Sequence, residues 1–254
     1  MQALLSSIEL LAQQAGAAIM AIYQADDFAS AAAVQQKADC SPLTAADLAA
    51  QRIISAGLAE LTPQWPQLSE EAALTPWQLR QQWQRYWLID PLDGSKEFIQ
   101  RNGEFTVNIA LIDHGAPVLG VVYAPALGKL YSADVQAKQA YCNGHAIHTQ
   151  PQLCANSPLR ILVSRSHRSA ADSITEDNTT EHRFIPMGSS LKFCLIAEGN
   201  ADIYRRIGPT SEWDTAAGHA LLVAAGGSVC TLDGQPLRYN QKPELLNPHF
   251  IARA

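Results

Sequence analysis

Apolar residues recur at steps of three and four between residues 4 and 22, which predicts one helix with a single apolar face. Its opposite face carries Gln13, Gln14 and serines but no Lys or Arg, so packing on a protein core is favoured over lying on a membrane surface. A second helix should begin at Thr44, because residues 44–47 (TAAD) match a capping box and apolar residues at helical spacing follow them.

Strand-like runs fill the middle of the chain, and short strands and helices alternate from about residue 157. The middle runs are residues 86–89, 105–112 and 118–123, the last two joined as a hairpin through residues 113–117, with residues 131 and 140–141 extending the sheet. The later strands are residues 160–163, 184–185 and 201–204, and the later helices are residues 190–197 and 215–225. This order predicts an α+β half, residues 1–156, followed by a smaller α/β half, residues 157–254.

The composition is that of a folded protein, with 47% apolar and 17% charged residues in a chain of 254. The net charge of -6 has the wrong sign for coating a nucleic acid polymer. The five cysteines are scattered and form no CxxC pair, which favours reduced thiols. The first residues lack the basic region of a signal peptide, and no apolar run reaches about 18 residues. We therefore expect a cytoplasmic protein without a transmembrane segment.

The most informative stretch is residues 88–95 (LIDPLDGS), where a predicted strand ends in two acidic residues. The strand should deliver Asp90 to its carboxyl end, and Asp93 should return to the same side three residues later. Gly94 then allows backbone to approach a ligand closely. On this octapeptide alone, an ordinary Asp-Gly turn after a strand remains an alternative.

Two more acidic residues stand at predicted element ends, Glu70 in the run SEE and Asp214 in the run WDTAAG. Taken singly, they could belong to a solvated loop and to a helix N-cap. Together with Asp90 and Asp93 they make four carboxylates, which cannot share a dry pocket uncompensated. Oxygen ligands without His or Cys select Mg²⁺. The sequence therefore predicts a magnesium site that could recruit an anionic substrate to an acidic protein.

The motif DPLDGS resembles the first signature of the Mg²⁺-dependent, lithium-sensitive phosphatase family that includes inositol monophosphatase and fructose-1,6-bisphosphatase, and WDTAAGHALLVAAGG resembles its second. The resemblance covers nearly the whole chain and implies a layered α/β/α/β/α sandwich. Within the family, QQWQRYWLIDPLDGSKEFIQRNGEFTVNIALIDHG and GSSLKFCLIAEG are most similar to the bacterial 3'(2'),5'-bisphosphate nucleotidases.

The resemblance also implies roles for individual residues. The residues that would hold two or three Mg²⁺ ions are Glu70, Asp90, Leu92 through its carbonyl, Asp93 and Asp214. Glu70 and Asp214 would also contact the substrate. Ser95 and Asp47 would orient the attacking water, and Ser95 stands where the family has Thr. Serine keeps the hydroxyl but loses the methyl group that stiffens χ1. The N–H groups of Gly94 and Ser95, at a helix start, would cradle the phosphate.

A second anion site is predicted in the second half of the chain. Ser189 and Lys192 open a helix after a strand, and Arg206 ends the next strand. By resemblance, these three residues would bind the 5'-phosphate of a nucleotide, and His167 would lie near its base or ribose. Basic residues stand where the hydroxyls of an inositol phosphate would need a carboxylate. The alternatives are a solvated strand end for Arg206 and a helix cap for His167.

The function that these expectations favour is Mg²⁺-dependent, lithium-sensitive hydrolysis of 3'-phosphoadenosine 5'-phosphate to AMP and phosphate, which would clear a by-product of sulfate assimilation. The alternatives are an inositol monophosphatase, a sugar-bisphosphate phosphatase and a non-catalytic sensor that binds metal and nucleotide. The expected partner is a small nucleotide and not a nucleic acid polymer, and the expected state is a monomer or homodimer. Peripheral attachment to the cytoplasmic face of the inner membrane is a minor alternative to a free cytoplasmic protein.

Overall fold

The computed structural model describes residues 1–28, 35–36, 42–150, 158–166 and 181–254. Its core is a seven-stranded sheet in the order β3-β4-β5-β6-β7-β8-β9, in which β3 runs parallel to β4 and the other neighbours are antiparallel. The strands are β3 (Gln67–Ser69), β4 (Arg85–Asp93), β5 (Thr106–Asp113), β6 (Ala116–Ala124), β7 (Lys129–Asp134), β8 (Gln139–Cys142) and β9 (His145–Ala146). The predicted hairpin is confirmed as β5–β6, with positive φ at both turn residues, His114 and Gly115.

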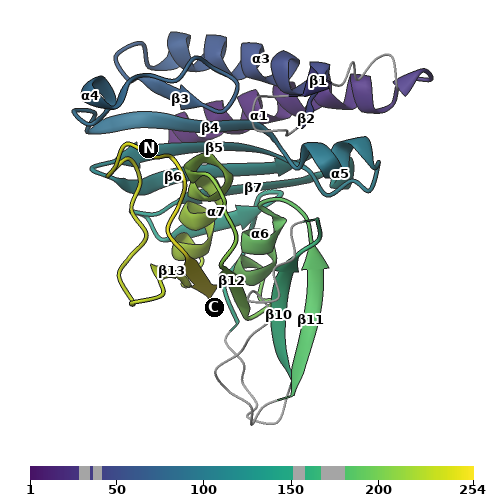
Figure 1. The fold of residues 1–254 in the computed structure, drawn as a ribbon, viewed down its shortest axis with the longest axis vertical. Coiled ribbons are helices and arrows are strands. Elements are labelled where there is room, and N and C mark those ends of the chain that lie inside the picture. Colours follow the sequence, from purple (N-terminus) through teal and green to yellow (C-terminus); the bar gives the residue numbers. More distant parts are fainter. Residues whose placement is uncertain (29–34, 37–41, 151–157, 167–180) are drawn as a thin grey trace.

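Two helices cover one face of this sheet, α1 (Gln2–Tyr23) and α3 (Ala45–Leu61) (Figure 1). Both were predicted, and the capping box between Thr44 and Asp47 is present at the start of α3. By length and composition alone, α1 could cross a membrane, and it is the one such helix among the described residues. Its apolar stripe is instead buried in one cluster with residues of α3 and the sheet; the stripe consists of Leu5, Ile8, Ala12, Ala15 and Ile19.

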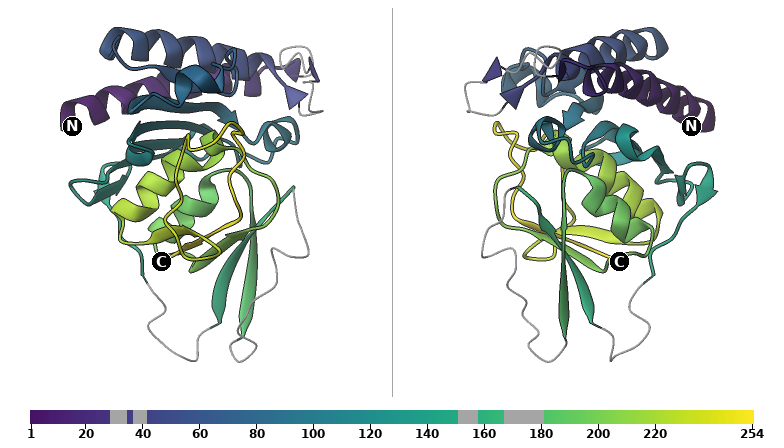
Figure 2. Two further views of the ribbon diagram at one scale, coloured as in Figure 1. Left: turned by 60° about the vertical axis from the view of Figure 1, so that its left-hand side comes forward. Right: turned by 90° about the vertical axis from the view of Figure 1, so that its right-hand side faces the viewer.

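The other face of the sheet is covered by α6 (Leu191–Ala197) and α7 (Glu212–Ala224), which lie between it and a second, five-stranded sheet (Figures 1 and 2). The second sheet has the order β11-β10-β12-β14-β13. Its strands are β10 (Leu159–Ser164), β11 (His182–Met187), β12 (Ile203–Arg206), β13 (Ser228–Thr231) and β14 (Phe250–Arg253). The first three strands are mutually parallel, and β14 and β13 are added antiparallel.

The α+β class and the layered sandwich are confirmed, with the described residues forming four layers in the order α/β/α/β. The fifth, helical layer of the expectation is not among the described residues, and neither is the predicted boundary at residue 156. Strands β13 and β14 were not predicted. Helix α7 begins before the predicted residue 215, because Ser211 is its N-cap and Asp214 is the third helical residue. The remaining short elements are β1 (Gln35–Gln36), β2 (Pro42–Leu43), α4 (Trp77–Arg80), α5 (Ser95–Ile99) and a 3₁₀ turn (Pro125–Leu127).

Helix α7 lies unusually close to the seven-stranded sheet at Gly120 of β6. A Cβ atom added at Gly120 would lie 2.6 Å from the carbonyl oxygen of Ala217 and 2.7 Å from the Cβ of Ala220. Both contacts are shorter than real Cβ contacts, and the first is with backbone that cannot rotate away. Glycine at this position therefore sets the distance between α7 and the sheet, and with it the position of the acidic residue in the first turn of α7.

We expect Gly120→Ala to lower the free energy of unfolding by about 1–3 kcal/mol, because overpacking forces the helix and strand apart. Chemical denaturation of the parent and the variant measures this. Gly208→Ala is the matched control, since its nearest contact would be an ordinary 3.7 Å, and it should change stability much less. Equal stability of the Gly120 variant and the parent would show that the close approach is not needed.

Candidate active site

The acidic residues of the DPLDGS motif lie on an irregular part of β4. Asp90 pairs with Asn108 of β5 and Asp93 pairs with Thr106, so two residues of β4 stand opposite one residue of β5. Such a bulge bends the strand and re-aims its side chains, and Pro91 fits there because it has no N–H to offer a partner strand. The bulge is stabilised locally by the Leu92 N–H, which donates to Asp90 Oδ1 at 3.1 Å.

Glu70 and Asp214 join Asp90 from two other elements. Carboxylate oxygens of these three residues all lie within 4.8 Å of one another. Glu70 follows β3, which is parallel to β4, so the carboxyl ends of the two strands meet at the same edge of the sheet. Asp214 lies in the first turn of α7, where its Oδ2 accepts hydrogen bonds from Thr210 Oγ1 at 2.8 Å and from the Ser211 N–H at 2.9 Å.

This cluster carries more negative charge than its own hydrogen bonds compensate. Burial raises the pKa of Asp90 well above its usual range, and Glu70 and Asp93 raise it further. Burial also raises the pKa of Asp214 to about 6, with Asp93 adding to the effect. Asp90 Oδ2 is buried without a hydrogen-bond partner among the described residues. An orphaned carboxylate oxygen in an all-oxygen donor set fits a hard divalent cation such as Mg²⁺.

Asp47 and Ser95 form a hydrogen-bonded pair beside the cluster. Ser95 Oγ donates to Asp47 Oδ1 at 3.2 Å, while Asp47 Oδ2 accepts from the N–H and the hydroxyl of Thr44 at 2.9 and 2.5 Å. The buried Asp47 therefore caps α3 and contacts Ser95 at the same time. Ser95 is the first residue of α5, and the preceding Gly94 has the left-handed φ of 94° that glycine adopts without strain.

One cavity of about 550 Å³ joins most of the predicted site residues. Of the predicted residues, it is lined by Glu70, Asp90, Leu92, Asp93, Gly94, Ser95, Ser189, Lys192, Arg206 and Asp214. Asp47 reaches the cavity through Ser95, and His167 lies outside the described residues. The structure thus brings residues from both halves of the chain to one place: Asp214 joins the acids of the first half, and the second half also supplies Lys192 and Arg206.

The positive end of the cavity consists of Lys192 and Arg206, both buried. Burial lowers the pKa of Lys192 to about 8, with Asp93 opposing and Arg206 adding to the effect. Arg206 Nη2 donates to the carbonyl of Pro209, but the buried Nε of Arg206 has no hydrogen-bond partner among the described residues. A donor without an acceptor beside a buried ammonium group is the arrangement that an anionic ligand satisfies.

Two residues that support Asp93 were not identified from the sequence. Ser190 Oγ lies 3.1 Å from Asp93 Oδ2 and 2.6 Å from the carbonyl oxygen of Asp214, so its single proton can be donated to either. Asn108 Nδ2 donates to Ser190 Oγ at 2.9 Å. The available signal was that Thr106 and Asn108 put polar side chains on one face of an otherwise apolar strand.

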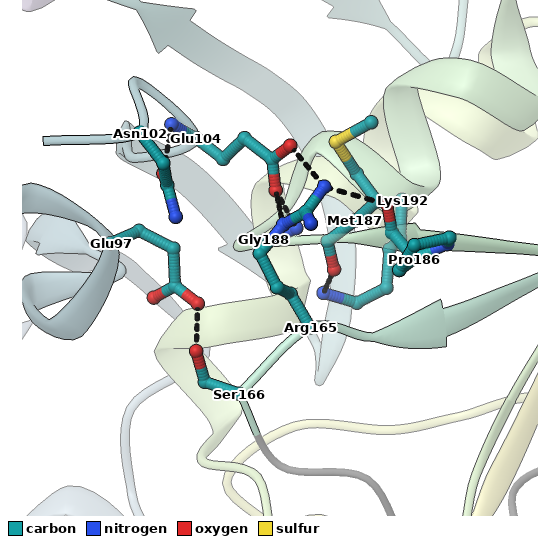
Figure 3. Close-up of polar contacts among 9 residues, drawn as sticks. All are labelled: Glu97, Asn102, Glu104, Arg165, Ser166, Pro186, Met187, Gly188 and Lys192. Carbon is teal, nitrogen blue, oxygen red and sulfur yellow. Dashed lines mark hydrogen bonds and ion pairs between the residues drawn. The ribbon is translucent and has the colours of Figure 1, made fainter. Parts of the chain in front are cut away.

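Glu97 was also not identified from the sequence. Its position corrects the expectation that basic residues stand where the hydroxyls of an inositol phosphate would need a carboxylate. Its side chain is only 4% exposed, lines the cavity and accepts a hydrogen bond from Ser166 Oγ (Figure 3). An acidic residue in the first turn of a helix is ordinarily explained by the helix dipole, so the sequence offered no sign of this placement.

The chain matches the sequence model of the Inositol monophosphatase family over residues 1–252. It belongs to the inositol monophosphatase family. Within this family, the chain is 51% identical to the 3'(2'),5'-bisphosphate nucleotidase CysQ of Escherichia coli (strain K12), over 97% of this chain and 98% of that protein.

Solved structures of the inositol monophosphatase family have the same fold. The crystal structure of CysQ from Bacteroides thetaiotaomicron superposes with a TM-score of 0.81 and 40% identity, covering 98% of this chain and 97% of that one. The inositol monophosphatase of Thermotoga maritima, at 24% identity, has a TM-score of 0.79, covering 100% of this chain and 92% of that one. The second likeness concerns the fold alone.

We expect Asp90→Asn to stabilise the metal-free protein by about 1 kcal/mol or more, because it removes a buried negative charge facing three others. Mg²⁺ should raise the melting temperature of the parent and should not raise that of the variant. At a free Mg²⁺ concentration one hundred times its dissociation constant, binding adds about 2.7 kcal/mol to the free energy of unfolding. Calorimetry with EDTA or MgCl₂ measures both effects.

Asp134→Asn is the matched control for that measurement. Asp134 is also buried, at 5% exposed, but it lies on β7 and accepts a hydrogen bond from the Ala137 N–H instead of facing the cluster. This variant should keep the full Mg²⁺ response. A Mg²⁺ response retained by Asp90→Asn would show that the acidic cluster is not the metal site.

Proposed function

We propose that this protein is a Mg²⁺-dependent phosphomonoesterase that acts on nucleoside 3'(2'),5'-bisphosphates and converts 3'-phosphoadenosine 5'-phosphate to AMP and phosphate. One observation carries the proposal: the same cavity is lined by a carboxylate cluster suited to Mg²⁺, here called its acidic end, and by the buried Lys192 and Arg206, here called its basic end. A substrate with two phosphates can place the reacting one at the first end and the other at the second. The bisphosphate nucleotidase named among the relatives supports the same substrate class.

In this proposal the reacting phosphate is held at the acidic end. When bound, Mg²⁺ supplies positive charge at this phosphate and lowers the pKa of water. The residues that would hold two or three ions are Glu70, Asp90, Leu92 through its carbonyl, Asp93 and Asp214. The N–H groups of Gly94 and Ser95 lie at the start of α5, and in this proposal they donate hydrogen bonds to oxygens of the same phosphate.

Ser95 and Asp47 act on the attacking water. Because Ser95 Oγ donates its own proton to Asp47 Oδ1, its lone pairs are available to accept a hydrogen bond from water. Asp47 is held in one orientation by the two hydrogen bonds that it accepts from Thr44, so its carboxylate can receive, through Ser95, the proton that the water releases. The pair thus aligns the water with the phosphorus and removes its proton.

The second phosphate is bound at the basic end. The Lys192 ammonium provides a compact charge, and the Arg206 guanidinium provides the unpartnered Nε donor. Ser189 also lines the cavity and adds a hydroxyl group. We propose that His167 contacts the base or the ribose.

An inositol monophosphate is the second candidate substrate, because the Glu97 carboxylate lines the cavity and could accept hydrogen bonds from sugar hydroxyls. It has no second phosphate for Lys192 and Arg206. The Lys192 ammonium and the unpartnered Arg206 Nε would then bind no phosphate, which is the physical reason to prefer the bisphosphate.

We also propose that the protein acts in the cytoplasm as a monomer or homodimer. The thiols of Cys142, Cys194 and Cys230 are free, which suits a reducing compartment. The apolar stripe of α1 is buried on the protein core, so it does not support attachment to a membrane.

We expect phosphate release with Mg²⁺ from 3'-phosphoadenosine 5'-phosphate to exceed that from inositol 1-phosphate and fructose 1,6-bisphosphate. Lys192→Met should raise KM for the nucleotide bisphosphate about 10- to 100-fold, the range that follows from losing one hydrogen bond to a charged group. Lys129→Met is the matched control, because Lys129 pairs with Glu198 outside the cavity. A preference for inositol 1-phosphate would transfer the assignment to inositol monophosphatase, and tight nucleotide binding without turnover would support a sensor.

Ser95→Ala should lower kcat about 10²- to 10⁴-fold with little change in KM, because it removes the group that aligns water and links it to Asp47. Ser95→Thr restores the hydroxyl together with a γ-methyl group that stiffens χ1, so we expect at least parental kcat. Steady-state kinetics at saturating Mg²⁺ test both variants. Parental turnover in the alanine variant would exclude Ser95 from the mechanism.

A further inference from the structure

Glu104 and Arg165 form a bidentate ion pair that joins the two halves of the chain. Arg165 Nε and Nη2 donate to Glu104 Oε2 and Oε1, each at 2.6 Å. The same two side chains also bind backbone: Arg165 Nη2 donates to the carbonyl of Pro186 at 3.0 Å, and Glu104 Oε2 accepts from the N–H of Gly188 at 2.7 Å (Figure 3). The pair therefore holds residues 186–189, which are the end of β11 and the start of its connection to α6.

Lys192 binds the backbone of the same segment, residues 186–189. Its ammonium group donates to the carbonyl of Ser189 at 2.6 Å. It also donates to the carbonyl of Met187 at 3.3 Å (Figure 3). Ser189 has a left-handed φ of 54°, a conformation that a serine adopts only where its surroundings impose it. Because Lys192 is buried with these carbonyls as its partners, the position of its charge follows the position of residues 186–189.

The segment has no room to move toward the first half of the chain. A Cβ atom added at Gly188 would lie 2.8 Å from the carbonyl oxygen of Glu104 and 2.9 Å from Cγ of Glu97. The backbone of Gly188 thus rests directly on the first half, and the ion pair holds it there.

The ion pair between Arg85 and Asp113 has side chains of similar exposure and serves as a comparison. Arg85 and Asp113 have side chains 40% and 16% exposed, almost the same as the 37% and 15% of Arg165 and Glu104. Exposed pairs of this kind contribute little to stability. What distinguishes Glu104 and Arg165 is that they bind the backbone of Pro186 and Gly188, next to Ser189, which lines the cavity.

Resting on the proposed function, we propose that Glu104 and Arg165 are positioning residues for the second phosphate of the substrate. They do not touch the substrate. They fix residues 186–189 against the first half of the chain, so that the carbonyls of Met187 and Ser189 hold the Lys192 ammonium at a set distance from the acidic cluster. The pair thereby contributes to the preference for a bisphosphate over a monophosphate.

The test compares 3'-phosphoadenosine 5'-phosphate with adenosine 3'-phosphate, which lacks the second phosphate, at saturating Mg²⁺. In Arg165→Met, KM for the bisphosphate should rise about tenfold, as a misplaced binding group predicts, while kcat for both substrates and KM for the monophosphate stay within about twofold of the parent. Arg85→Met is the matched control and should change neither KM. Equal losses with both substrates would show that the pair is merely structural and would overturn the proposal.

Two further variants separate positioning from loss of charge. Gly188→Ala keeps every charge but pushes the segment away, and it should reproduce the selective rise in KM. In a Lys192→Met background, Arg165→Met should have no further effect, because the pair acts through Lys192. A full additional tenfold rise in that background would overturn the proposal.

The parent enzyme distinguishes failure of this inference from failure of the proposed function. A parent that binds both substrates equally would contradict the proposed function and the inference that rests on it. A parent that prefers the bisphosphate, with variants that keep the whole preference, would contradict the inference alone.

Discussion

The structure depends on keeping several carboxylates together in a buried place without letting them move apart. Asp90 is 1% exposed and faces Glu70, Asp93 and Asp214, so every element that carries one of these residues is under electrostatic repulsion. The fold opposes this repulsion with rigid packing. The bulge in β4 fixes two of the acids on one strand, and the glycine at position 120 lets α7, which carries Asp214, pack closely on the sheet.

Two acids of the site lie in the first turn of a helix, and this position explains how they can be buried. Asp47 and Asp214 are each the third residue of a helix and the acidic member of a capping box, with Thr44 and Ser211 as the N-caps. A carboxylate at this position receives backbone and side-chain hydrogen bonds and lies at the positive end of the helix dipole. The same interactions fix its rotamer. The same hydrogen bonds that cap the helix therefore also hold the carboxylate in the site. An acidic residue at the start of a helix can have both roles.

How far the sequence could predict this depends on whether the signal was local. The helix at Thr44, the hairpin at residues 113–117 and the acids of DPLDGS are encoded by neighbours in the chain, and the acidic cluster was expected from such local signals. The layered sandwich was expected from the resemblance to the phosphatase family. Strands β13 and β14 have four residues each and pair across 18 intervening positions, so no local pattern marks them. Glu104 and Arg165 are 61 residues apart. Their contact exists only because the two halves dock, and it leaves no periodic trace in the sequence.

The start of α6 connects the two ends of the cavity, and this connection explains how one site can distinguish phosphate esters. Ser190 joins it to Asp93 and Asp214 on the acidic side, while Lys192, one half-turn later, binds the carbonyls of Met187 and Ser189 on the basic side. A net charge of -6 gives the protein no general attraction for anions, so selection must come from fixed local charges. Because both ends are anchored to one short helix, the distance between the metal-binding acids and the buried ammonium is set by the fold and not by the ligand. In the proposed function, the enzyme would therefore recognise the spacing of two phosphates, a property that neither a monophosphate nor a more extended bisphosphate can reproduce.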